Sequence, residues 1–207
     1  MIRMHRGVLA LAAIVGLTAC GSGGSSKASS ATYGSACPSA STVAGSNRGP
    51  ETNPPGDIPD NQAFVAYSPP DNLYTVKVPE GWARRETAGG VTFTDKLNRI
   101  EVRVVDAAAA PTVDSATAAD VPAVAAGAAC FSLGQVRAVS RPAGTAVLLT
   151  YQADAAADPV TGKVVHDDVE RYAFWKDGKE VVLTLSGPAG SDNVDPWRIV
   201  TDSFGWR

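Results

Sequence analysis

The chain has 207 residues, with 18 basic and 21 acidic side chains and a formal charge of −3. This length suits one domain with a tail, and no cluster of Lys or Arg occurs along it. Nucleic-acid-binding proteins usually carry a basic patch that contacts phosphates, so we expect no nucleic-acid partner. Ala and Val are abundant and Arg outnumbers Lys. Such a bias is typical of a GC-rich genome and leads us to expect an actinobacterial source.

The first 20 residues have the three-part pattern of a secretory signal peptide. Arg3 and Arg6 give a charged start, residues 7–19 are apolar and small, and Cys20 directly follows Leu17-Thr18-Ala19. This pattern resembles the lipobox of bacterial lipoproteins. The resemblance implies that residues 1–19 are cleaved off, that the Cys20 thiol is lipidated through a thioether, and that the new amine is acylated with a chain such as palmitate.

A transmembrane helix is the alternative for this segment. The apolar run is about 13 residues long, whereas a spanning helix needs about 20. We therefore expect the mature chain to be anchored through Cys20 at the outer face of the cytoplasmic membrane, without crossing it. Loss of Arg3 and Arg6 leaves 16 basic and 21 acidic side chains, a formal charge of −5.

The two other cysteines, Cys37 and Cys130, form an even pair in an oxidising compartment. A disulfide between them closes a loop of about 94 residues, which stabilises the fold by about 4–5 kcal/mol in the chain-entropy model. Two buried free thiols are the alternative. Tetrahedral zinc needs four N or S ligands, and the mature chain has one histidine, His166. We therefore expect no metal site, and no cofactor is expected either.

Residues 20–61 have the composition of a tether. The stretch 21–26 is of the flexible Gly/Ser type, and 38–61 is rich in proline with few large apolar side chains. A segment of this kind buries too little surface to fold alone. The sequence thus predicts a signal peptide at 1–19, a lipidated tether at 20–61 and a folded domain at 62–207.

Alternating apolar residues predict strands in the domain, separated by turns. In chain order these strands cover residues 64–68, 74–78, 91–94, 100–104, 130–139, 146–153, 164–175 and 180–186. Within 100–104, alternate side chains are apolar and charged, which indicates a sheet with one wet face. Tight turns, the strongest at Asp177-Gly178, favour pairing of strands that follow one another in sequence.

Two helical segments are expected. One covers 114–126, with Asp114 or Ser115 as its cap, and Pro122 should break or kink it so that a second turn starts near Val121. The other opens at Asp195-Pro196, with the aspartate as N-cap, and runs to about residue 204. The sequence therefore predicts an α+β fold, an antiparallel sheet of about 7–8 strands flanked by two or three helices.

Three motifs occur together in this domain. They are a strand ending in Val78-Pro79-Glu80-Gly81-Trp82, a Ser186-Gly187-Pro188 segment before the last helix, and Trp197 followed by Ser203-Phe204. The combination resembles the Mog1/PsbP-like superfamily, including LpqN-type actinobacterial lipoproteins, over about residues 63–207. The resemblance implies an αβα sandwich with a binding or accessory role and no shared catalytic residues. The Pro-rich segment and the cysteine pair are departures from that pattern.

Catalytic motifs are weak. No Gly-x-Ser-x-Gly elbow occurs, and His166 is flanked by Asp167 and Asp168, of which Asp168 shares its strand face. Asp154, Asp158, Asp167 and Asp168 lack the spacing of a calcium loop. We expect no catalytic residue; the alternative is an envelope hydrolase with His166 as general base.

Four tryptophans remain to be placed. Trp82 and Trp197 are expected in the core, whereas Trp175 and Trp206, together with His166, are the candidate surface for a ligand or partner. The leading expectation is a lipid-anchored extracytoplasmic domain that binds an envelope protein or ligand without catalysis. A chaperone-like or structural envelope factor is a further alternative.

Overall fold

A computed structural model describes Cys37 and residues 56–207. The expected signal peptide, the lipidation site Cys20 and most of the expected tether lie outside the described residues. No helix within the described ranges is long and apolar enough to cross a membrane.

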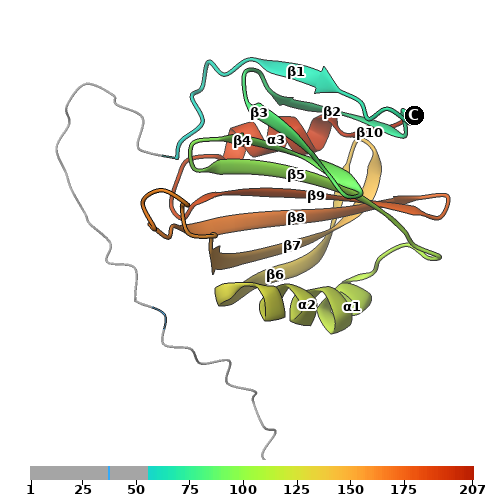
Figure 1. Ribbon diagram of the computed structural model, residues 1–207. Coiled ribbons are helices and arrows are strands. Elements are labelled where there is room, and N and C mark those ends of the chain that lie inside the picture. The colour runs from blue at the N-terminus through green and yellow to red at the C-terminus, as the bar shows by residue number, and fades with distance from the viewer. Residues whose placement is uncertain (1–36, 38–55) are drawn as a thin grey trace, which may run out of the picture. The chain divides into compact units, whose positions relative to one another are not determined.

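Ten strands form two antiparallel sheets in this part of the chain (Figure 1). The large sheet has the order β3 (Ala83–Thr87), β4 (Gly90–Asp95), β5 (Asn98–Asp106), β9 (Lys179–Pro188), β8 (His166–Lys176), β7 (Gly144–Asp154) and β6 (Ala129–Arg141). The small sheet has the order β1 (Phe64–Tyr67), β2 (Tyr74–Pro79) and β10 (Gly205–Trp206). The predicted α+β class with an antiparallel sheet is confirmed.

Two strands and one pairing differ from the expectation. β3 is exposed along its whole length, so it lacks the alternation that marks a strand, and β10 has only two residues. Sequential pairing is wrong for β5, which pairs with β9, so that Ile100 lies opposite Leu185. The chain leaves the sheet after β5 to form the helical segment, and the later strand β9 takes the central position beside β5.

The first helical segment runs without a break from α1 (Val113–Ser115) through a π-helical turn, η1 (Ala116–Asp120), into α2 (Val121–Gly127). The expected break before Pro122 does not occur, although the α-helical hydrogen-bond pattern does resume at Val121, in α2. The Val121 N–H donates to the Ala116 carbonyl, five residues back. This wider turn directly precedes Pro122, which lacks an N–H, and it lets the segment continue past the proline.

Both predicted N-caps are wrong. Thr112 caps the first segment: its hydroxyl accepts from the Ser115 N–H at 3.0 Å, and the Ser115 hydroxyl accepts from the Thr112 N–H at 2.9 Å. The last helix, α3 (Val194–Ser203), follows Asn193 as N-cap in place of Asp195. The Asn193 side chain makes no cap hydrogen bond because it bonds to more distant parts of the chain.

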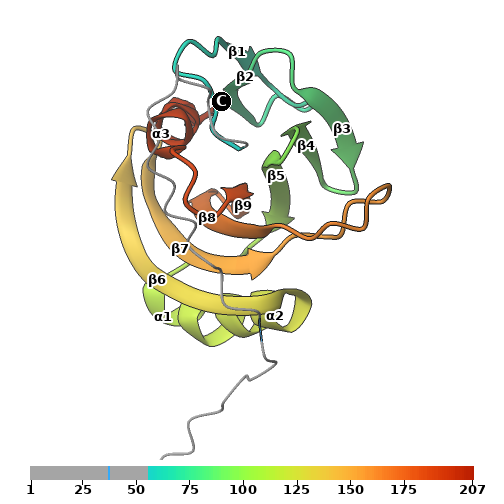
Figure 2. The same ribbon diagram turned by 90° about the vertical axis from the view of Figure 1, so that its left-hand side faces the viewer.

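The large sheet is strongly curved (Figure 2). Its concave face holds the core, which is closed by α3 and the small sheet, and the segment α1–α2 lies on the convex side beside β6. Trp197, Val200 and Phe204 of α3 are all buried in this core, as their helical spacing predicts. Helices therefore lie on both faces of the large sheet.

Residues that precede Gln62, the expected start of the domain, already pack against the domain at Gly56 and Ile58. Ile58 is 4% exposed and belongs to the core. The Asn193 amide donates to the Gly56 carbonyl at 3.0 Å and accepts from the Ile58 N–H at 2.8 Å, while Asn98 donates to the same Gly56 carbonyl at 2.8 Å. We call this group of buried contacts the asparagine clasp.

Cys37 and Cys130 are joined by a disulfide, with their Cα atoms 5.4 Å apart. Cys130 lies at the start of β6, just after the end of α2. The bond therefore ties a residue of the N-terminal segment to an edge strand of the large sheet.

Candidate functional site

A groove of about 370 Å³ opens on the concave face of the large sheet, between the start of α3 and the ends of β6, β7 and β8. We call it the inner groove. It is lined by Ser132, Leu133, Gly134, Thr150, Tyr151, Gln152, Asp168, Val169, Glu170, Pro188, Ser191, Asn193, Val194 and Trp197.

The inner groove is both apolar and acidic. Leu133 is 46% exposed and Val194 is 72% exposed, whereas Trp197 is 8% exposed. Asp168 and Glu170 are the charged side chains among the lining residues just given, and no basic side chain is among them. Exposed apolar side chains that gather at a groove mark a binding surface more often than isolated ones do.

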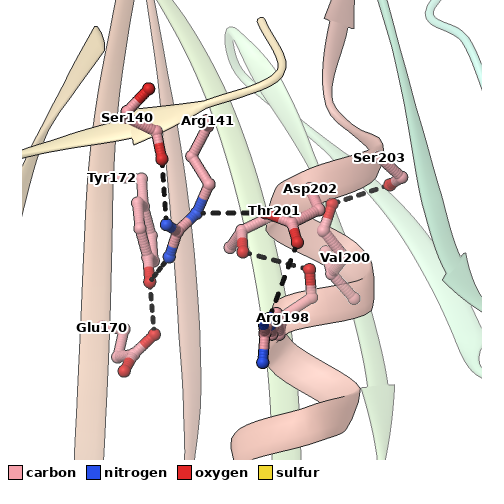
Figure 3. A network of polar contacts seen from close by, with 9 residues as sticks. All are labelled: Ser140, Arg141, Glu170, Tyr172, Arg198, Val200, Thr201, Asp202 and Ser203. Carbon is pink, nitrogen blue, oxygen red and sulfur yellow. Dashed lines mark hydrogen bonds and ion pairs between the residues drawn. The ribbon is translucent and has the colours of Figure 1, made fainter. Parts of the chain in front are cut away.

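A network of polar contacts fixes one wall of this groove (Figure 3). The Tyr172 hydroxyl donates to Glu170 at 2.7 Å and accepts from Arg141 Nη2 at 3.0 Å. Arg141 in turn forms an ion pair with Asp202 of α3 at 3.4 Å. Burial, together with the nearby Glu170 carboxylate, raises the pKa of Tyr172 to about 12. The phenol therefore stays protonated and holds Glu170 in one orientation.

Asp168 is also fixed by its neighbours. Its Oδ1 accepts from Gln152 Nε2 at 2.8 Å, and its Oδ2 accepts from the Gly190 N–H at 3.0 Å. These bonds join β8 to β7 and to the loop before α3. Both acids of the groove are thus held by contacts within the domain, as a preformed site requires.

A second hollow, of about 500 Å³, lies on the opposite face of the sheet, and we call it the outer cleft. Its walls come from the β4–β5 hairpin, the residues after α2 and the β7–β8 connection. Its lining includes Lys96, Arg99, Glu101, Gly127, Ala128, Tyr151, Ala153, Asp158, Lys163, Asp167, Val169, Thr184 and Ser186. Tyr151 and Val169 line both hollows, so these lie on either side of the same stretch of sheet.

Asp167 is the unusual residue of the outer cleft. It is 7% exposed, and its Oδ1 is buried with no hydrogen-bond partner among the described residues. Burial raises its pKa to about 6, although the positive charges of His166 and Arg99 oppose this rise. Buried carboxylates are normally hydrogen-bonded, so this one needs an explanation.

His166 forms a pair with a different aspartate from the one we expected. Its Nδ1 lies 2.7 Å from Asp154 Oδ1, directly across the β7–β8 ladder. Asp168 shares its face but is bound to other groups. Within residues 56–207 no serine, threonine or cysteine side chain hydrogen-bonds to His166.

The four aspartates considered for calcium do not converge. Asp154 bonds to His166, Asp168 to Gln152, and Asp167 faces the outer cleft. Asp158 accepts from the Thr161 N–H at 2.7 Å within its own turn, and such bonds lower its pKa. In the described part of the chain, no group of three or more His, Cys, Asp or Glu residues is placed to hold a metal ion.

The tryptophans proposed as an exposed surface are half-buried. The Trp175 indole donates to the Ala107 carbonyl at 2.8 Å. Trp206 packs edge-on against Phe204, with ring centroids 5.3 Å apart. Trp82 packs at the edge of the core, and Trp197, assigned to the core, also lines the inner groove. Sequence reasoning thus missed Trp197 as a groove residue, because helical spacing shows only that it faces inward.

No protein-family model matches the chain, and no curated protein matches it in sequence. Solved structures do resemble it in fold. Cyanobacterial PsbP (CyanoP) from Synechocystis is 19% identical, covering 79% of this chain and 99% of that one, with a TM-score of 0.49. The Ran-binding protein Mog1p of Saccharomyces cerevisiae is 12% identical, covering 70% and 96%, with a TM-score of 0.47.

LpqN of Mycobacterium tuberculosis, which is involved in cell envelope biogenesis, is also similar. It is 13% identical, covering 70% of this chain and 91% of its own, with a TM-score of 0.40. PsbP, Mog1p and LpqN are the proteins whose superfamily the sequence motifs resemble. At these identities the likeness concerns the fold, and the ligands of those proteins do not follow for this chain.

Proposed function

We propose that this chain is a lipid-anchored, non-catalytic binding domain of the cell envelope, and that a segment of a partner protein occupies its inner groove. One observation carries the proposal: an exposed apolar side chain, a tryptophan and two fixed carboxylates line the same groove. Val194 and Trp197 offer apolar contact, while Asp168 and Glu170 give a negative charge that no lining residue balances. The complementary partner is an extended segment with apolar side chains and a basic residue.

Site-specific photocrosslinking in cells tests this proposal. A photoreactive amino acid at Val194 should capture a discrete partner, because Val194 lines the groove at the start of α3 and is 72% exposed. The matched control is Val160, which is 90% exposed in the β7–β8 connection. Equal capture at both positions, or none at Val194, would contradict the proposal. Broad capture of many unrelated proteins would favour the chaperone-like alternative.

A separate variant tests how much the negative charge of Glu170 contributes to partner binding. Glu170→Gln keeps an oxygen that can accept from the Tyr172 hydroxyl, so the wall of the groove should stay in place. We expect capture at Val194 to fall severalfold in this variant, with unchanged thermal stability. Undiminished capture would show that the partner does not use the charge.

Membrane attachment depends on Cys20, which lies outside the described residues. Signal peptide, lipidation and outer-face location are supported by the lipobox pattern and remain part of the proposal. Replacing Cys20 by Ala should move the protein from the membrane fraction to the soluble extracytoplasmic fraction. A variant that stays in the membrane fraction would argue for another anchor.

The hydrolase alternative has one observation in its favour, the His166–Asp154 pair at 2.7 Å. A carboxylate at Nδ1 orients a histidine that acts as a general base. His166→Ala separates the two functions. We expect partner capture at Val194 to survive this change, and loss of a measurable hydrolytic activity would instead support the enzyme.

A further inference from the structure

The outer cleft contains a buried acceptor that the protein itself leaves unused. Asp167 is 7% exposed, and its Oδ1 has no hydrogen-bond donor among the described residues. Arg99 and His166 act on it electrostatically, but neither forms an ion pair with it within residues 56–207. A carboxylate held in this way is ready to bind a donor that comes from outside the chain.

The cross-strand register leaves no polar side chain directly opposite this carboxylate, because its partner on β9 is Pro188. Ala153 lies directly opposite Asp167 on β7 and contributes only a methyl group. On β9, Ser186 and Thr184 face Val169 and Arg171 of β8, and both hydroxyls line the cleft. Their hydroxyls have no hydrogen-bond partner within the described ranges, so they are free to bind a ligand.

An aromatic wall completes the site. Tyr151 packs against Phe131 with ring centroids 5.4 Å apart. Burial raises the pKa of Tyr151, and the charges of Glu101 and Asp167 act in the same direction. The phenol is therefore protonated at neutral pH and presents a neutral ring and hydroxyl beside the carboxylate.

We propose that the outer cleft binds the primary ammonium group of a polar ligand through the Asp167 carboxylate, while the hydroxyls of Ser186 and Thr184, farther along β9, bind other polar groups of the same ligand. An ammonium brings both a positive charge and N–H donors, so its hydrogen bond to a buried carboxylate is stronger than that of a neutral donor. The ligand is either a free amine, such as an amino sugar, or a lysine side chain of another protein. The cleft lies on the opposite face from the inner groove, so this site is independent of the proposed function.

Calorimetric titration of the full chain in detergent tests the proposal with matched probes. The first pair is glucosamine and N-acetylglucosamine, and the second is Nα-acetyl-lysine amide and its Nε-acetylated form. In each pair, acetylation removes the charge and leaves most of the molecule intact. We expect one ammonium probe to bind about tenfold or more tightly than its acetylated form. The pair with the larger ratio identifies the source of the amine.

Asp167→Asn is the decisive variant because it keeps the shape of the side chain and removes its charge. It should weaken binding of the ammonium probe about tenfold or more. Asp114→Asn, which removes an exposed carboxylate from α1, should leave binding within about twofold. Equal binding of charged and acetylated probes, no binding of any ammonium probe at millimolar concentration, or full binding by Asp167→Asn would each overturn the proposal.

Discussion

At the scale of single residues, the buried Asp167 carboxylate lowers the stability of the folded protein at neutral pH. Its pKa is raised to about 6 in the folded protein from a usual value of 3.8, so the folded state holds a proton that the unfolded state releases between these values. Stability from this group is therefore full below about pH 4 and falls as the pH rises to about 6. The nearby charged groups act in both directions: His166 and Arg99 lower its pKa, while Asp168 and Asp154 raise it.

The change in the free energy of unfolding caused by Asp167→Asn should therefore be more favourable at pH 7 than at pH 4. A shift of about two pKa units corresponds to about 3 kcal/mol at most. Thermal unfolding of both proteins from pH 4 to pH 8 measures this difference, with Asp114→Asn as the control. A difference that stays flat over this range would show that the Asp167 carboxylate titrates normally.

The sequence showed which face Asp167 is on but not its environment. Alternation along 166–168 places His166 and Asp168 on one face and Asp167 on the other. The partner of His166 could not be read from this alternation, because Asp154 lies on a different strand and its register with β8 depends on the length of the connection between them. The burial of this carboxylate cannot be predicted from the sequence either, since it depends on the loops that cover it.

At the scale of elements, all strands of the two sheets were predicted except the fully exposed β3 and the two-residue β10. The alternation of β5 identified its buried face correctly, because Ile100 and Val102 are both fully buried. β3 has no apolar face to detect. The N-cap of α3 was misassigned because aspartate is a common N-cap residue and Asp195 precedes Pro196. Asn193 occupies the N-cap position instead, but its side chain makes no cap hydrogen bond and donates to the Gly56 carbonyl.

The contribution of the asparagine clasp to the stability of the fold can be tested by substitution. Asn193→Ala removes the bonds to the Gly56 carbonyl and Asn98, and it leaves the buried Ile58 N–H without its acceptor. Loss of buried hydrogen bonds with an orphaned donor should cost about 2–4 kcal/mol. Chemical denaturation measures this cost, and faster proteolysis next to Ile58 should accompany it.

Asp195→Ala, at an exposed residue of the same helix, is the control and should change stability by less than about 0.5 kcal/mol. Equal losses of stability in the two variants would contradict a stabilising role of the asparagine clasp.

At the scale of the whole molecule, the two hollows on opposite faces separate two binding tasks. The inner groove is bounded by α3, which the Arg141–Asp202 ion pair joins to the large sheet. The outer cleft is bounded by the residues after α2, close to the disulfide at Cys130. A change that loosens one boundary therefore need not affect the other hollow.

Reduction of the disulfide tests this separation. The Cys37–Cys130 bond closes a loop with a sequence separation of 93 residues, for which chain entropy predicts a stabilisation of about 4–5 kcal/mol. The native protein should weigh about 2 Da less than the reduced one, because the bond lacks two hydrogens. The Cys37→Ser, Cys130→Ser double variant should unfold at a markedly lower temperature than the oxidised protein.

The same variant should affect the two hollows unequally. Gly127 and Ala128 line the outer cleft immediately before Cys130, so release of that cysteine loosens this wall and should weaken binding of the ammonium probe. The inner groove is fixed by contacts among β7, β8 and α3, and partner capture at Val194 should persist below the melting temperature. If capture at Val194 fell as much as ammonium binding, the two faces would be coupled through the sheet, and the two sites would have to be treated as one.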